Sequence, residues 1–119
     1  MTRAPCERLL DILTSCEVIA AYIARDDGGD EGLLFDALRM RLLEIGEAAK
    51  DLPTSLTDTE PEIPWSMIVR NRDRLAHRYF DTVHAIVFEA ARHEAPILSQ
   101  AVRRILAVID EAERRGAHN

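Results

Sequence analysis

One eleven-residue stretch of the sequence, RNRDRLAHRYF at residues 70–80, holds side chains that can cleave a phosphodiester bond. His77 can act as general base on a ribose 2′-OH or as general acid on the leaving 5′-oxygen. Arg72 can pair a phosphate through two N–H groups and stabilise the extra negative charge of the transition state. Asp73 precedes His77 by four residues, so on a helix its carboxylate can accept the imidazole N–H. The stretch predicts Arg72 and His77 as catalytic residues, with Asp73 in support.

The same stretch carries a local excess of positive charge. The whole chain has a formal net charge of −6 at pH 7, but residues 70–78 contain four arginines and one aspartate. Arg70, Arg74 and Arg78 are predicted to hold the phosphates on either side of the cleaved one, in a salt-sensitive contact. An acidic protein is a poor candidate for coating nucleic acid generally. Any RNA contact must therefore be local.

The spacing of Arg72 and His77 sets a geometric condition on such a site. Five residues of regular helix turn through about 500°, which leaves the two side chains roughly 140° apart around the axis. Two solutions remain open. Either the helix ends between the two residues, or a two-fold axis brings Arg72 of one chain near His77 of another.

The elements that must position these residues are predicted to be helices. Apolar residues recur at three- and four-residue spacing along most of the chain, which predicts an all-α, antiparallel bundle of four to five helices. At 119 residues the chain is predicted to form a single domain over 1–119. The expected helices cover residues 5–25, 31–51 and 65–76, a segment that starts at Asp81 or Thr82, and a segment that starts at Pro96. A loop is expected at 51–64 and a frayed tail at 115–119.

Cysteine and histidine spacing argues against a disulfide or a metal centre. Cys6 and Cys16 lie ten residues apart on one predicted helix, roughly 15 Å along its axis and too far for a disulfide. They are expected to be free thiols in a reducing cytoplasm. The histidines have no zinc-ligand spacing with either cysteine, so no metal and no cofactor is expected. No apolar run is long enough for a membrane span, and the charged N-terminus does not resemble a signal peptide.

Three ordered blocks of the sequence resemble one known family. RDRLAHRY supplies the pattern Arg-x4-His-x-Tyr as Arg72, His77 and Tyr79, with Phe80 after the tyrosine. DALRMRLLEIGEAAKDLP at 36–53 and PEIPWSMI at 61–68 are similar to the second helix of the family and to the stretch that leads into its motif. Together the blocks cover roughly residues 30–98. The chain resembles the HepT-like members of the HEPN superfamily.

The resemblance implies a function that spacing alone does not. HepT-like proteins are all-helical homodimers with RNase activity, and they are the toxin half of a toxin–antitoxin pair. Their partner is a minimal nucleotidyltransferase, which transfers AMP onto the motif tyrosine, here Tyr79. Adenylylation would place a negative phosphate beside His77 and Arg72 and would compete with RNA for the cleft.

The sequence departs from the family pattern at one important position, and two other interpretations stay open. Asp73 stands where many relatives have asparagine, and a longer Arg-x6-His spacing would use Arg70 with Asn71 as its polar neighbour. Arg72 is preferred because it keeps the family's separation from Trp65. One alternative interpretation is a non-catalytic nucleotide-binding or partner-docking subunit of a nucleotidyltransferase complex. Another is a purely structural helical dimer.

Overall fold

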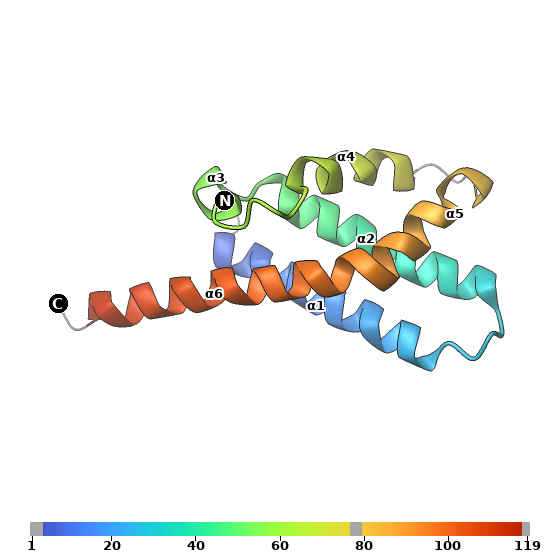
Figure 1. Ribbon diagram of the computed structural model, residues 1–119, viewed down its shortest axis with the longest axis horizontal. Coiled ribbons are helices and arrows are strands. Elements are labelled where there is room, and N and C mark those ends of the chain that lie inside the picture. Colours follow the sequence, from blue (N-terminus) through green and yellow to red (C-terminus); the bar gives the residue numbers. More distant parts are fainter. Residues whose placement is uncertain (1–3, 77–79, 118–119) are drawn as a thin grey trace.

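A computed structural model describes residues 4–76 and 80–117, and every regular element within those ranges is helical (Figure 1). The prediction of an all-α bundle is confirmed. The elements in chain order are α1 (Pro5–Arg25), α2 (Glu31–Lys50), the short α3 (Thr54–Thr57), α4 (Trp65–Ala76), α5 (Phe80–Glu89), a π-helical turn η1 (Ala90–Glu94) and α6 (Ala95–Ala117).

Helix α2 is the central element of the bundle. It packs against α1 on one side and against α4 and α5 on the other, while α6 lies across α1. Figure 1 shows α4 lying along α2, at some distance from the crossing of α1 and α6. The helix that carries the basic segment therefore rests chiefly on α2.

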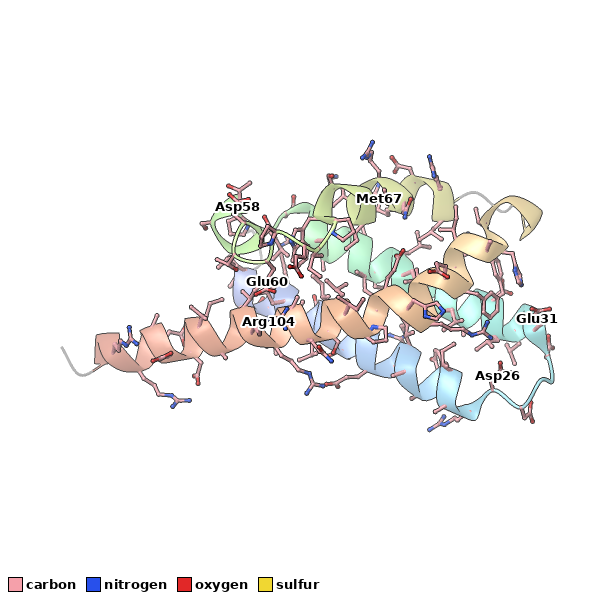
Figure 2. The ribbon with its side chains drawn as sticks, in the orientation of Figure 1. Asp26, Glu31, Asp58, Glu60, Met67 and Arg104 are labelled. Atoms are coloured by element: carbon pink, nitrogen blue, oxygen red, sulfur yellow. The ribbon has the colours of Figure 1, made fainter. Side chains whose placement is uncertain are left out.

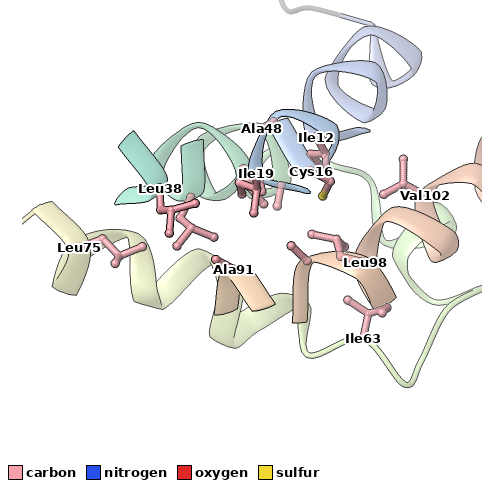
Figure 3. Close-up of a cluster of buried hydrophobic side chains, with 14 of the residues drawn as sticks. Ile12, Cys16, Ile19, Leu38, Ala48, Ile63, Leu75, Ala91, Leu98 and Val102 are labelled. Atoms are coloured by element: carbon pink, nitrogen blue, oxygen red, sulfur yellow. The ribbon is translucent and has the colours of Figure 1, made fainter. Parts of the chain in front are cut away.

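The core consists of the apolar stripes that the sequence periodicity predicted. Six side chains are almost completely buried: Leu9, Ile12, Ile19, Leu38, Val87 and Val102. Burial of each stabilises the fold by roughly 1.5–3 kcal/mol. In Figure 3 Leu75 of α4 points toward Leu38 of α2, whereas Ile12, Cys16 and Val102 lie where α1 meets α6. Leu75 is 4% exposed and anchors the second half of α4 in this core.

Glycines and acidic residues form the turn between α1 and α2. Gly28 has a φ of 79°, a left-handed conformation that glycine adopts without steric cost. Asp30 is the N-cap of α2, and its side chain accepts a hydrogen bond from the backbone N–H of Leu33 at 3.0 Å. This turn reverses the chain and makes α1 and α2 antiparallel neighbours.

The predicted loop at 51–64 contains one short helix, α3, that the sequence did not reveal. Its carboxyl side is held by Glu60, whose backbone carbonyl accepts the indole N–H of Trp65 at 3.1 Å. The carboxylate of Glu60 accepts two N–H groups of Arg104 from α6, at 2.6 and 3.1 Å, and the two residues lie together in Figure 2. These hydrogen bonds hold the pKa of the Glu60 carboxyl below its usual value. Trp65 thus has a structural role at the start of α4.

The last third of the chain differs from the prediction in two ways. Helix α5 begins at Phe80, so the prediction that Asp81 or Thr82 starts the helix as its N-cap was wrong. Pro96 does not start a separate helix, because α5 passes through η1 directly into α6. Proline has no N–H to donate to the carbonyl of Arg92, and the wider π turn accommodates that missing hydrogen bond.

Helix α6 also continues further than expected. Residues 115–117 lie in α6, where a frayed tail from 115 had been predicted. The helix projects beyond the other elements (Figure 1), which contributes to the elongated dimensions of 55 × 28 × 27 Å. Its exposed end carries i,i+4 ion pairs between Arg114 and Asp110 and between Arg115 and Glu111, which support an exposed helix.

Candidate ribonuclease site

Arg72 is positioned by a close approach between α4 and α2. A Cβ atom built on Gly46 of α2 would lie 3.0 Å from the Cβ of Arg72 and 3.4 Å from the backbone oxygen of Ile68. Because Gly46 has no side chain, α4 can approach α2 closely at this point. The stem of Arg72 therefore crosses α2 where there is no side chain in the way.

The guanidinium of Arg72 is engaged by two carboxylates. One N–H group pairs with Glu47 of α2, and the other nitrogen lies 3.5 Å from the carboxylate of Asp73. The Arg72 side chain is 29% exposed, whereas those of Glu47 and Asp73 are 61% and 78% exposed. An incoming phosphate can thus reach the guanidinium, but it must compete with carboxylates that already occupy both sides of the fork.

A groove with a volume of about 790 Å³ runs beside Arg72. It is lined by α1, α2 and α4, and its charged lining residues are Arg8, Asp11, Arg41, Glu44, Glu47 and Arg72. Among the residues that the structure describes, three arginines and three acids line the groove, so this part of the lining has no net formal charge. Of the three arginines at positions 70, 72 and 74, Arg72 lines this groove, whereas Arg70 and Arg74 do not.

The other arginines of α4 lie on a different face. Arg70 and Arg74 are exposed and are separated by four residues, so they share one face of the helix, roughly 160° from Arg72. Within residues 4–76 and 80–117 neither has a carboxylate within ion-pair distance, and Arg74 lines a separate groove with Asn71, Ile86 and Glu89. The structure does not bring Arg70 or Arg74 together with Arg72.

The remaining predicted site residues cannot be placed. His77, Arg78 and Tyr79 lie outside the described residues, as does the predicted contact between Asp73 and His77. The described part of α4 ends at Ala76, which lines the groove beside Arg72. How Arg72 and His77 are related in space stays a prediction.

Sequence reasoning missed two residues that hold α4. Glu47 of α2 pairs with Arg72, which is 25 positions away in the chain. Arg39 of α2 donates hydrogen bonds to the backbone carbonyls of Leu75 and Ala76. No local pattern reveals such contacts, because they depend on the register between α2 and α4.

His84 lies outside this site, in an aromatic cluster at the far end of α2. Its ring stacks with Phe35 at a centroid distance of 6.0 Å and packs against Phe88 at 4.5 Å. Its Nε2 is 3.0 Å from the Glu31 carboxylate. Arg92 lies over the Phe88 ring at 4.9 Å and near Asp26. These contacts join α5 and η1 to the turn between α1 and α2, which is a structural role.

Comparison with known proteins decides the family. A family model described as Ribonuclease HepT-like matches residues 9–105, which is most of the chain. The chain belongs to the HepT-like ribonuclease family. The match begins within α1 and ends within α6, so it includes all of α2 and α4 and the HepT-like motif at residues 72–79.

Individual HepT-like relatives agree with this membership. "Putative RNase TTE0752" of Caldanaerobacter subterraneus subsp. tengcongensis is 33% identical over 107 residues, which are 87% of this chain and 96% of that protein. "Putative RNase MJ0125" of Methanocaldococcus jannaschii is 34% identical over 107 residues, 87% of this chain and 91% of the relative. "Probable ribonuclease HepT" of Thermococcus cleftensis is 38% identical over 102 residues, 82% and 92% of the two chains.

Neither the known structures nor the hydropathy of the helices adds to the family assignment of this HepT-like chain. No solved structure matches it significantly. Among the described helices, none is both long and apolar enough to cross a membrane.

Proposed function

We propose that this chain is a metal-independent endoribonuclease and the toxin component of a toxin–antitoxin system. The observation that carries the proposal is the setting of Arg72. Its guanidinium is held by a helix pair at the edge of a groove, partly exposed, and Ala76, which lines the same groove, directly precedes His77 in the sequence. The family match supports RNA as the substrate class.

The proposed reaction is transesterification at one phosphodiester of RNA. A histidine accepts the proton of the 2′-OH while the 2′-oxygen attacks phosphorus and the bond from phosphorus to the 5′-oxygen breaks. A histidine donates a proton to that leaving oxygen, so the products are a 2′,3′-cyclic phosphate and a 5′-hydroxyl. Arg72 stabilises the charge that builds up on the non-bridging oxygens. Asp73 orients His77, and Arg70, Arg74 and Arg78 contact neighbouring phosphates.

A homodimer would supply the two histidines that this reaction uses. In a two-fold arrangement, His77 of one chain acts as the base and His77 of the other acts as the acid. Arg72 of one chain then acts on the same phosphate as His77 of its partner. The exposed faces of Arg70 and Arg74 then belong to the path of the flanking RNA. We expect the reaction to take place in the cytoplasm. RNA is present there, and the free thiols of Cys6 and Cys16 are typical of a reducing compartment.

Adenylylation of Tyr79 by a cognate minimal nucleotidyltransferase is the proposed means of neutralisation. The tyrosine oxygen attacks the α-phosphorus of ATP, pyrophosphate leaves, and the phenolic proton passes to solvent. The attached phosphate adds negative charge two residues from His77 and competes with RNA for Arg72.

RNA cleavage in the presence of EDTA tests the proposal. The purified chain should cleave single-stranded RNA and leave cyclic phosphate ends. His77→Ala should abolish cleavage with an unchanged circular dichroism spectrum, and Arg72→Lys should reduce kcat by roughly 100-fold, since lysine keeps the charge but loses the bidentate geometry. Arg103→Lys on α6 is the matched control. Cleavage by His77→Ala at the wild-type rate would show the mechanism to be wrong.

One observation favours the alternative of a non-catalytic subunit that docks a nucleotidyltransferase. The described lining of the groove at Arg72 is balanced in charge, and carboxylates pair with the guanidinium. Coexpression with a cognate minimal nucleotidyltransferase distinguishes the two. AMP on Tyr79 together with lost RNase activity supports the toxin, whereas a stable complex without RNA cleavage by the free chain supports the docking subunit.

A further inference from the structure

Arg39 of α2 holds the backbone at the carboxyl end of the described part of α4. Its Nε donates to the carbonyl oxygen of Leu75 at 2.5 Å, and a terminal nitrogen donates to the carbonyl oxygen of Ala76 at 3.4 Å. The two acceptors are successive residues, so one guanidinium spans two peptide units. The side chain is half-buried between the helices.

Such a contact has a definite physical effect on the backbone that it binds. A peptide carbonyl has two lone pairs, so it can accept a side-chain donor whether or not it also accepts a backbone N–H. A charged donor binds a carbonyl more strongly than a neutral one, and the planar guanidinium loses little entropy when it does so. Arg39 therefore attaches the backbone at Leu75 and Ala76 to α2.

The contact of Arg39 is one of three attachments of α4 to the same helix. Leu75 packs its side chain into the core opposite Leu38, the residue before Arg39 (Figure 3). One turn of α4 earlier, Arg72 crosses α2 at Gly46 and pairs with Glu47. Arg39 and Glu47 are eight residues apart, about 12 Å along α2. The interval from Arg72 to Ala76 is thus fixed at both ends by one rigid element.

We propose that Arg39 is a positioning residue of the ribonuclease site. It sets the direction in which the backbone leaves Ala76 toward His77, relative to the guanidinium of Arg72. This inference rests on the proposed function of Arg72 and His77. Arg39 is not among the described residues that line the groove beside Arg72, and it acts through the backbone of α4.

The test is a set of three variants assayed for RNA cleavage over a range of RNA concentrations. Arg39→Met keeps the apolar length and removes the donors. Because a displacement of about 1 Å can cost 10²-fold, we expect kcat to fall roughly 100-fold while KM stays within about threefold. Arg39→Lys reaches one carbonyl instead of two and should recover part of the lost kcat. Arg103→Met, which removes the same charge from α6, should leave kcat unchanged.

Amide hydrogen exchange of residues 72–76 supplies a second measurement that does not depend on cleavage. Exchange should be faster in Arg39→Met than in wild type and unchanged in Arg103→Met. Faster exchange with a wild-type kcat would overturn the positioning role, and so would a raised KM with a normal kcat, which would indicate a phosphate contact. If Arg39→Met does not fold, a wild-type kcat in Arg39→Lys overturns the proposal. Lack of cleavage by the wild-type protein would refute the proposed function instead, and the exchange data would still test the attachment of α4 by Arg39.

Discussion

Gly46 and Arg72 lie in direct contact where α2 and α4 cross, and a methyl group on Gly46 would meet the Cβ and Cγ of Arg72 at 3.0 and 3.3 Å. These contacts involve the stiff base of the arginine side chain, so a clash cannot be relieved by rotating its far end. The position of the guanidinium therefore depends on the absence of a side chain one helix away.

Gly46→Ala should destabilise the protein by roughly 1–3 kcal/mol, because α4 must move to make room for the methyl group. This loss exceeds the gain of up to about 1 kcal/mol in helix propensity. Urea unfolding followed by circular dichroism measures the difference. Gly116→Ala is the matched control, since nothing lies within 4 Å of a Cβ there. It should be neutral or slightly stabilising, and equal effects at the two glycines would contradict the packing argument.

The sequence was sufficient to predict the elements and their boundaries where apolar periodicity and glycine or proline signals agree. Both ends of α1 and of α2, and the start of α4, fell within a residue of their predicted positions. Such features depend on residues close in the chain. The start of α5 and the continuous passage through η1 were missed, because a π turn before Pro96 has no distinct residue signature.

The candidate site was predicted less completely, for a physical reason. A cluster of arginines in the sequence suggests a common cleft, but successive even-numbered positions on α4 alternate between opposite faces. Arg72 faces α2, whereas Arg70 and Arg74 face outward. Their separation depends on which stripe of α4 is buried, and that is decided by Leu75 and Ile68 packing onto α2.

Glu47→Gln should tighten the interaction of the protein with RNA. The carboxylate competes with phosphate for Arg72, and an exposed ion pair of this kind is worth about 0.2–1 kcal/mol. We expect KM for single-stranded RNA to fall roughly two- to fivefold, with kcat nearly unchanged. Steady-state cleavage of a fluorogenic RNA gives both constants. Glu17→Gln, which breaks the pair with Arg103 on the opposite side of the bundle, should leave both unchanged. A higher KM in Glu47→Gln would mean that Glu47 assists binding.

Arg70→Gln and Arg74→Gln should each weaken RNA binding in a salt-dependent manner. Both side chains are exposed, and among the described residues neither is paired with an acid, so their charges are available to phosphates. Loss of one phosphate contact should reduce the slope of log Kd against log salt by about 0.7 for single-stranded RNA. Fluorescence anisotropy with catalytically inactive His77→Ala protein measures that slope. Arg103→Gln should not change it, and an unchanged slope in both α4 variants would remove these arginines from the RNA path.

Cys16 should be chemically inert in the folded protein. Burial, with a smaller contribution from Glu17, raises the pKa of its thiol to about 12, so the nucleophilic thiolate is scarcely populated at neutral pH. In native protein at pH 8, iodoacetamide should label Cys6, which is partly exposed, and leave Cys16 unmodified until urea is added. Mass spectrometry of tryptic peptides distinguishes the two sites. Because the folded pKa lies above the usual value of 9.0, the thiol ionises first in the unfolded chain as pH rises. The free energy of unfolding should therefore decrease between about pH 9 and 12, and it should decrease less in Cys16→Ala. Rapid labelling of native Cys16 at pH 8 would contradict its burial between α1 and α6.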